Sequence, residues 1–401
     1  MPKQKQKLKI PEGWQQLSLK ETGKCIRGVS YKPEQLLSTR DHRGVSLFRS
    51  NNIQENHLDL NDVKVVSSEC VSPDQFLKTG DIFLCMSNGS KELVGKNVYI
   101  NKIQNSTVGA FCAIFRSNED VNSEYVRYLF KSEQYISEIK DRLAGTSINN
   151  LKNSDIESLV FKFPPKSEQQ KIAEILNAAD EAIQKTEEVI TKAEELKRGL
   201  MQELLTHGIG HTKFKKTKIG KIPEEWEVVK LGEVCNFTTG KLNSNAAVFG
   251  GKYPFFTCSQ ETFAIDQFSF NSKAILLAGN NAAGVYSVKY YNGKFDAYQR
   301  TYVITVKDEK ILNYLFFKEI LSSKLNELKE GSVGTNTKFL TMSLLLNIEI
   351  VLPSIHEQEK ISDILDTLSL KSVANKKLLA KQLELKRGLM QDLLSGKVRT
   401  K

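Results

Sequence analysis

The sequence predicts an α+β protein in which two long antiparallel coiled-coil helices join two mixed α/β domains, with an internal repeat about a pseudo-two-fold axis. Three observations lead to this prediction. A segment of about 60 residues occurs twice, 189 residues apart and without a gap. A short phrase ending in tryptophan opens each half of the chain. The stretches between phrase and repeat differ, which indicates constant helices that carry two variable domains.

The repeated segment is most alike at its two ends. Residues 195–205 and 384–394 agree at ten of eleven positions, and residues 168–176 align with 357–365 at the same spacing. The central turns are almost unrelated. Two near-identical surfaces related by a two-fold axis suit two copies of one partner. The alternative is a helical spacer with no further role.

Residues 164–207 are expected to form the first long helix, because they contain no proline after the first two positions and a single glycine. Ser167 with Gln170 suggests a capping box, and Gly208 suggests a C′ glycine. Apolar or small residues recur at alternating steps of four and three, the seam of a coiled coil: Ile172, Leu176, Ala179, Ile183, Thr186, Ile190 and Ala193. Other apolar residues are expected to widen this stripe: Ile175, Leu196, Leu200 and Leu204.

The second long helix is expected at residues 353–396. Its apolar residues lie at positions that match the first copy: Ile361, Leu365, Leu368, Leu379, Leu385, Leu389 and Leu393. Ser372 and Asn375 make the centre of its seam more polar. A homodimeric zipper would not need two copies in one chain, so we expect the helices to pack on each other. Gly199 and Gly388 match although glycine inside a helix costs about 1 kcal/mol, which supports two equivalent partner surfaces; close helix–helix approach is the alternative.

Composition restricts the class of protein. A chain of 401 residues exceeds the usual single core, so at least two domains are expected. The net charge of +10 indicates a polyanionic partner. No apolar run approaches 18 residues and no signal peptide is evident, which argues against a membrane protein. Six cysteines without metal-binding spacing indicate reduced thiols and a cytoplasmic location.

The opening phrase defines the two halves. It reads Lys-Ile-Pro-Glu-Gly-Trp at residues 9–14 and Lys-Ile-Pro-Glu-Glu-Trp at residues 221–226. The expected order is a first domain at 1–163 and the first helix. A basic linker at 208–222, a second domain at 223–352 and the second helix follow.

Each variable domain is expected to hold short strands followed by one helix. In the first domain the helix is expected at about 121–142, after five strand candidates: Val45–Arg49, Val63–Ser67, Asp81–Ser87, Asn97–Ile100 and Ala110–Arg116. In the second it is expected at about 311–330, after four: Pro254–Ser259, Ala274–Gly279, Gly284–Tyr291 and Thr301–Val306. Tyr128-Leu-Phe130 and Tyr314-Leu-Phe316 are expected to mark the same helix.

Enzyme motifs are mostly absent from the sequence. The loop at residues 89–97 resembles a phosphate-binding loop but has five residues between its glycines and lacks the final Ser or Thr. Pro73-Asp74 is not followed by the Glu-x-Lys of a metal-dependent nuclease, and the histidines, including His207 and His211, form no metal pattern. We therefore predict no catalytic residue, no metal ligand and no cofactor bound by this chain.

Basic and amide-rich loops remain as candidates for DNA binding. Arginine, asparagine and glutamine form paired hydrogen bonds with base edges, while lysine mainly meets phosphate. The candidates in the first domain are Arg40, Arg43, Asn88, Lys91, Lys96 and Arg116, and those in the second are Asn280, Asn281, Lys289, Tyr298, Gln299 and Arg300. For any one of them a solvated side chain is the alternative.

The whole pattern resembles the DNA-specificity (S) subunits of type I restriction–modification systems. The resemblance rests on Ile-Pro-x-x-Trp in each half, on Gly145-Thr146 and Gly334-Thr335 before a Pro-x-x-x-Glu-Gln helix start, and on Leu-Lys-x-Gly-Leu-Met-Gln-x-Leu-Leu at each helix end. The residues that match the repeated helix ends, and so imply partner binding, are Glu168, Gln169, Lys171, Lys197, Gly199, Leu200, Glu357, Gln358, Lys360, Lys386, Gly388 and Leu389.

The resemblance implies a non-catalytic subunit with two target-recognition domains, each reading one half of a split DNA site. It implies two modification (methyltransferase) subunits on the helices and restriction (helicase–nuclease) subunits in the full complex. S-adenosylmethionine, ATP and Mg²⁺ would then belong to those partners. Two readers on one face of B-DNA favour half-sites about one turn, ~34 Å, apart. A stand-alone nuclease and a non-DNA scaffold are the alternatives.

Overall fold

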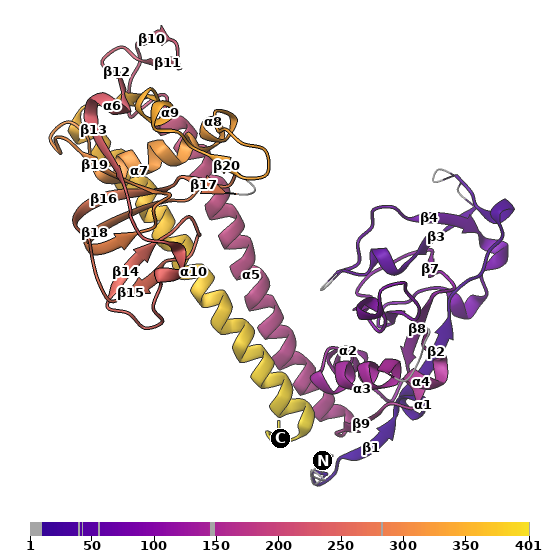
Figure 1. Ribbon diagram of the computed structural model, residues 1–401. Coiled ribbons are helices and arrows are strands. Elements are labelled where there is room, and N and C mark those ends of the chain that lie inside the picture. Colours follow the sequence, from indigo (N-terminus) through magenta and orange to yellow (C-terminus); the bar gives the residue numbers. More distant parts are fainter. Residues whose placement is uncertain are drawn as a thin grey trace. The chain divides into compact units, whose positions relative to one another are not determined.

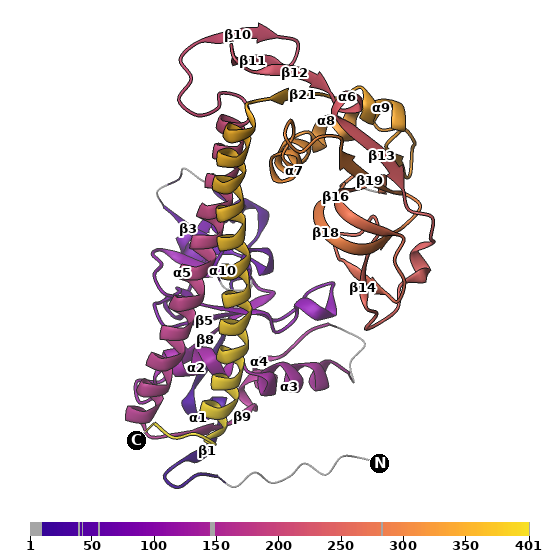
Figure 2. The same cartoon turned by 90° about the vertical axis from the view of Figure 1, so that its left-hand side faces the viewer.

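The structure is a computed structural model that describes residues 10–38, 41, 43–54, 57–144, 149–281 and 284–400. The chain divides into two compact units, Met1–Lys185 with Leu379–Lys401, and Thr186–Leu378. Each unit contains one variable domain together with part of each long helix (Figure 1, Figure 2).

The two long helices are α5 (Lys166–Leu204) and α10 (Ile355–Ser395). The predicted seam of α5 is confirmed, since Ile172, Leu176, Ile183, Thr186 and Ile190 are buried. In the first unit Asp180 of α5 forms an ion pair with Lys386 of α10. In the second unit Glu194 lies 2.6 Å from Lys376. As residue numbers rise along α5 they fall along α10, so the helices are antiparallel and the predicted fold class is confirmed.

Two details of the predicted helices are wrong. The helix α5 begins at Lys166, so Ser167 lies inside its first turn and does not cap it. The amide of Glu168 donates to the Pro165 carbonyl instead. Ile175, Leu196 and Leu385 do not widen the seam, because these residues are 38%, 53% and 62% exposed.

The first unit is built from a two-stranded, a four-stranded and a three-stranded sheet, with short helices, around the ends of α5 and α10. Strands β1 (Gln15–Ser18) and β9 (Val160–Phe163) pair antiparallel. A four-stranded sheet has the order β2 (Gly23–Arg27), β8 (Cys112–Ser117), β5 (Ile82–Cys85), β6 (Asn97–Tyr99). A three-stranded sheet has the order β4 (Lys64–Ser67), β3 (Gly44–Phe48), β7 (Ser106–Val108). The helices are α1 (Leu19–Thr22), α2 (Ser123–Leu129), α3 (Glu133–Ala144) and α4 (Asn153–Glu157).

The second unit repeats this plan with a larger sheet. Strands β12 (Glu227–Lys230) and β21 (Glu349–Leu352) pair as β1 and β9 do. The six-stranded sheet has the order β13 (Cys235–Thr239), β19 (Thr301–Val306), β16 (Phe270–Ala278), β18 (Val288–Ala297), β14 (Tyr253–Phe256), β15 (Phe263–Ile265). Two small pairs are β10 (Phe214–Thr217) with β11 (Gly220–Pro223) and β17 (Asn280–Asn281) with β20 (Lys338–Phe339). The helices are α6 (Leu231–Val234), α7 (Tyr314–Ser323), α8 (Leu325–Glu330) and α9 (Met342–Leu346).

The single helix expected near the end of each domain is in fact two: α2 with α3, and α7 with α8. Tyr128 of α2 and Tyr314 of α7 mark corresponding helices, as predicted, but they do not occupy the same position in them. Asn122 caps α2 and Asn313 caps α7, and each accepts from amides of the following turn. Tyr314 follows its cap directly, whereas Tyr128 lies six positions after its own.

The core of each unit joins a variable domain to the long helices. In the first unit Trp14, Phe115 and Tyr125 are buried in one cluster with Ile172 of α5 and Leu393 of α10. In the second, Trp226 and Phe317 share a cluster with Leu204, Leu205, Ile361 and Leu365. Each domain therefore folds onto the start of one long helix and the end of the other.

All six cysteines are free, and four of them are buried: Cys25, Cys85, Cys112 and Cys235. Burial raises the pKa of the Cys25 thiol to about 12. None of the helices in the described part of the chain combines the length and the apolar character that a bilayer span requires.

Candidate nucleic-acid interface

The Glu-Gln pair that starts α5 holds the first domain together from within. The Trp14 indole Nε1 donates to Glu168 Oε2 at 3.1 Å, and Arg399 near the end of the chain donates to both carboxylate oxygens at 2.8 and 2.9 Å. Gln169 accepts from the Asn122 amide at 2.9 Å and donates to the Pro164 carbonyl at 2.8 Å. The pair thus connects the opening phrase and the cap of α2 to α5.

The second unit repeats these contacts at α10. Trp226 Nε1 donates to Glu357 Oε2 at 3.0 Å, while His211 takes the place of Arg399, with its Nε2 at 2.9 Å from Glu357 Oε1. Gln358 accepts from the Asn313 amide at 2.9 Å. The assignment of Glu168, Gln169, Glu357 and Gln358 to a partner surface is therefore corrected, since their polar atoms bind within their own units. Lys171 and Lys360 remain exposed.

The other repeated end of each helix presents an open surface. Apart from the neighbouring residues and nearby backbone of the same helix, no heavy atom of the described residues lies within 4 Å of a Cβ built on Gly199 or Gly388, so close helix approach does not explain these glycines. Leu196 and Leu385, three positions earlier, are the exposed leucines noted above. Leucine and glycine at this spacing lie on neighbouring turns of one helix face. We refer to residues 196–199 and 385–388 as the helix-end surfaces.

The other residues predicted at these helix ends make contacts within their own units. Lys197 lies 3.2 Å from the buried Glu319 carboxylate, and Lys386 pairs with Asp180. Leu200 and Leu389 are half-buried and pack against the cores of their units. Exposed Leu196 and Leu385 are better candidates for a partner contact.

The candidates in the first domain do not gather at one place. Arg40 lies outside the described residues, and exposed Arg43 forms an ion pair with Asp41 at 3.0 Å. Asn88 donates to Ser50 Oγ at 3.2 Å at the end of β5. Lys91 is exposed and Lys96 is half-buried.

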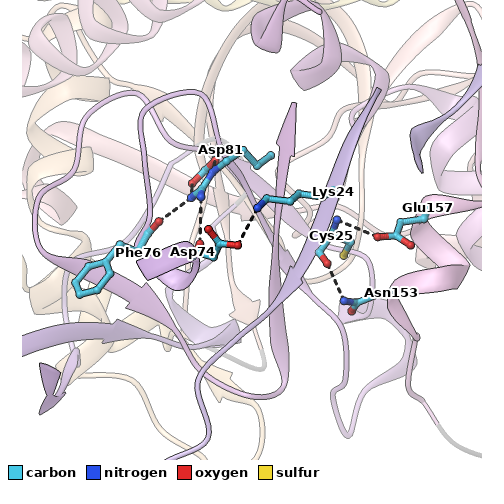
Figure 3. A network of polar contacts seen from close by, with 8 residues as sticks. Lys24, Cys25, Asp74, Phe76, Asp81, Asn153 and Glu157 are labelled. Atoms are coloured by element: carbon cyan, nitrogen blue, oxygen red, sulfur yellow. Dashed lines mark hydrogen bonds and ion pairs between the residues drawn. The ribbon is translucent and has the colours of Figure 1, made fainter. Parts of the chain in front are cut away.

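Arg116 belongs to an internal network and is removed from the candidate set. Its guanidinium donates to both oxygens of the buried Asp81 at 2.8 and 2.7 Å and to the Phe76 carbonyl at 2.7 Å. Figure 3 shows this network beside the ion pair of Lys24 with Asp74. Burying the pair makes it costly for Arg116 to leave Asp81 for a phosphate or a base.

The candidates in the second domain do come together, with one exception. Asn280 and Asn281 form β17 directly after β16, and Tyr298, Gln299 and Arg300 form the turn that enters β19. The neighbouring strands β16 and β19 place both segments at one edge of the sheet. Lys289 is the exception, because its Nζ donates to the carbonyls of Ser259 and Glu261 at 3.0 and 2.7 Å.

A family model for the type I restriction modification DNA specificity domain matches residues 11–195 and again residues 223–385. The chain belongs to this family. The type I restriction enzyme EcoDI specificity subunit of Escherichia coli is 40% identical over 149 residues, which are 37% of this chain and 32% of that protein. The match thus spans about a third of that relative.

One further relative and one solved structure each cover 98% of the chain. The MjaVIII specificity subunit of Methanocaldococcus jannaschii is 29% identical over 433 aligned positions, 98% of this chain and 95% of its own. The crystal structure of a type I restriction–modification S subunit from M. genitalium shares the fold with a TM-score of 0.64 at 18% identity, covering 98% of this chain and 99% of that one. The family model therefore places this chain among the type I DNA-specificity proteins, and neither alternative, a stand-alone nuclease or a non-DNA scaffold, finds support in these matches.

Proposed function

We propose that this chain reads a bipartite, asymmetric site in double-stranded DNA, with one target-recognition domain for each half. The observation that carries the proposal is a family domain present twice, with the same internal anchors but unlike loops. The repeated tryptophan–glutamate contacts attach both domains to the helices in the same way. The unlike loops would let the two domains read different sequences in the two halves of the DNA site. The net charge of +10 suits a partner whose backbone is a polyanion.

The domain boundaries belong to this proposal. The first reader comprises residues 1–163 and the second 223–352. The helices at 164–207 and 353–396 act as spacers, with the basic linker 208–222 between the halves. The linker region includes the hairpin of β10 and β11. A cytoplasmic location fits a protein that acts on DNA.

We further propose that two modification subunits dock on the helix-end surfaces, one on each. An exposed leucine beside an open glycine occurs in both helices at matching positions, which is what two copies of one partner require. Restriction subunits complete the assembly. S-adenosylmethionine, ATP and Mg²⁺ are then held by those partners and not by this chain.

Methylation mapping tests the reading function. Genomic DNA from cells that carry the complete system is sequenced with detection of methylated bases, and a strain lacking this chain serves as control. We expect a motif of two short, non-palindromic halves separated by unspecified bases, lost in the control. A single contiguous palindrome, or a motif that persists without this chain, contradicts the proposal.

A further inference from the structure

Three segments of the first domain meet at one end of the four-stranded sheet, where β5 ends and β8 begins. Residues 109–112 form a turn in which the Cys112 amide donates to the Gly109 carbonyl at 2.8 Å. Within this turn the Phe111 carbonyl accepts from the amides of Met86 and Ser87 at 2.9 and 3.0 Å. The Leu151 amide in turn donates to the Met86 carbonyl at 2.8 Å. We call this meeting of strand end, turn and returning segment the junction.

The second domain contains the same junction with three of these four backbone bonds, and the bond of the Ser87 amide has no counterpart among the described residues there. The Thr301 amide donates to the Tyr298 carbonyl at 2.8 Å, and the Arg300 carbonyl accepts from the Gly279 amide at 2.8 Å. The Leu340 amide donates to the Gly279 carbonyl at 2.8 Å. Phe111 and Arg300 therefore occupy one position, the third residue of the turn, although the local sequences of the two domains are unrelated.

A glycine presses against this turn in both domains. A Cβ on Gly28, which follows β2, would lie 2.2 Å from the Gly109 carbonyl oxygen, and one on Gly240, which follows β13, would lie 1.8 Å from that of Ala297. Both are contacts that real Cβ atoms do not make. The backbone frame of the junction is thus held from several sides, and side chains are what differ between the domains.

The side chains presented at the junction differ in chemistry. Phe111 is 70% exposed, and exposed Arg300 takes its place in the second domain. The Arg300 guanidinium lies 5.7 Å from the centre of the Phe339 ring, which restricts the plane of its donors. A single exposed phenylalanine needs no explanation on its own. What needs an explanation is that Phe111 in one domain and Arg300 in the other occupy the same backbone position. The protein is proposed to read two unlike half-sites, so a different side chain at a matched position is expected where bases are read.

We propose that the third residue of this turn reads a base in each half-site. Phe111 offers only an apolar face, and the apolar group on a base edge of the major groove is the thymine methyl. Arg300 offers paired donors that match O6 and N7 of guanine. The first half-site therefore requires a thymine at the position that Phe111 meets, and the second a guanine at the position that Arg300 meets. The inference rests on the proposed function, because it assigns residues to the reading of each half.

The test uses the complete modification complex with variant chains and the methylation mapping described above. Phe111→Asn is expected to relax one position of one half-site by about tenfold or more, the usual cost of a mismatched base pair. Phe111→Leu, which keeps an apolar tip, retains the preference. Arg300→Ala relaxes a position in the other half-site only. Matched controls are Leu60→Ala, since Leu60 is 67% exposed in the same domain as Phe111, and Lys310→Ala, since exposed Lys310 lies beyond the far end of β19.

The outcomes separate the two proposals. A bipartite wild-type motif that stays unchanged in both junction variants overturns this inference and leaves the proposed function intact. A change in both half-sites from one variant, or an equal change in the controls, also overturns it. A wild-type motif that is not bipartite overturns the proposed function first. Thermal unfolding of each variant chain verifies that the exposed substitutions leave the fold unchanged.

Discussion

Trp14 and Glu168 lie 154 positions apart, and the indole of one donates to the carboxylate of the other at 3.1 Å. Trp226 and Glu357 repeat the bond at 3.0 Å in the second unit. The tryptophan of the opening phrase and the glutamate of the helix start are thus two ends of one contact. This explains why both motifs recur together, because each tryptophan needs the carboxylate of its own helix start.

Removing the carboxylate should loosen the first unit. Glu168→Ala leaves Trp14 and Arg399 without their acceptor, and the loss of hydrogen bonds at a buried site costs about 1–3 kcal/mol of the free energy of unfolding. Urea denaturation of the full chain measures the cost. Glu174→Ala, at an exposed position one and a half turns further along α5, is the control and should change stability little.

The same contact predicts a dependence on acid. The Arg399 guanidinium, which donates to Glu168, holds the pKa of that carboxyl below its ordinary value of 4.5. The folded state then binds the proton less readily than the unfolded state does. The contribution of the ionised Glu168 to the free energy of unfolding is fully present above the unfolded pKa. It is lost as pH falls through the lower folded pKa. Denaturation of the wild type and Glu168→Gln should differ most at neutral pH, and the difference should shrink as pH falls below the unfolded pKa of 4.5 and through the lower folded pKa. A constant difference across that window contradicts the assignment.

Much of the helical frame follows from sequence periodicity. The steps of four and three from Ile172 to Ile190 predict a buried seam because an α-helix returns to the same face at that spacing. The inward roles of Glu168 and Gln169 could not be predicted in this way, since their partners Trp14 and Asn122 are distant in sequence. Polar residues at a helix start look alike whether they bind a neighbour or a partner protein.

The site was harder to predict than the frame. Arg116 met the criterion of a basic loop residue, yet it lies on β8, where Asp81 of the neighbouring segment binds it. Nothing in the sequence singles out Phe111, because the criterion was hydrogen-bonding capacity. Only the backbone equivalence with Arg300 reveals it, and that equivalence depends on strand pairing that local sequence does not encode.

The helix-end surfaces predict partner stoichiometry. Leu196→Glu or Leu385→Glu places a charge where an apolar contact is proposed, so each variant should bind one modification subunit in place of two, and the double variant none. Titration calorimetry with the purified modification subunit measures this number. Val373→Glu, at a 65% exposed residue of α10 outside these surfaces, is the control. Two subunits bound to the double variant would falsify the proposal.

Binding to DNA should fall steeply with salt. Phosphate contacts release counterions, so a protein that makes several of them loses orders of magnitude in affinity between ~50 and ~200 mM salt. Fluorescence anisotropy with a duplex that carries the mapped motif measures the slope for the complex. Lys91→Ala is expected to reduce the slope by about one contact if this exposed lysine meets phosphate. An affinity that does not respond to salt argues against a DNA-binding role.

The close contact of Gly28 with the turn at residues 109–112 predicts that this glycine holds Phe111 in place. The Cβ of Gly28→Ala would fall 2.2 Å from the Gly109 carbonyl oxygen and 2.6 Å from that of Val108. Neither is the end of a flexible side chain, so the turn must shift. Overpacking of this kind costs about 1–3 kcal/mol. Gly89→Ala, in the same domain, is the matched control, because among the described residues nothing lies within 4 Å of its Cβ. Chemical denaturation should separate the two variants, and the methylation map of Gly28→Ala should weaken in the half-site that depends on Phe111 while the other half-site keeps its sequence. Equal stability of the two variants would show that the turn is free to move, and that the junction does not hold its reading residue in place.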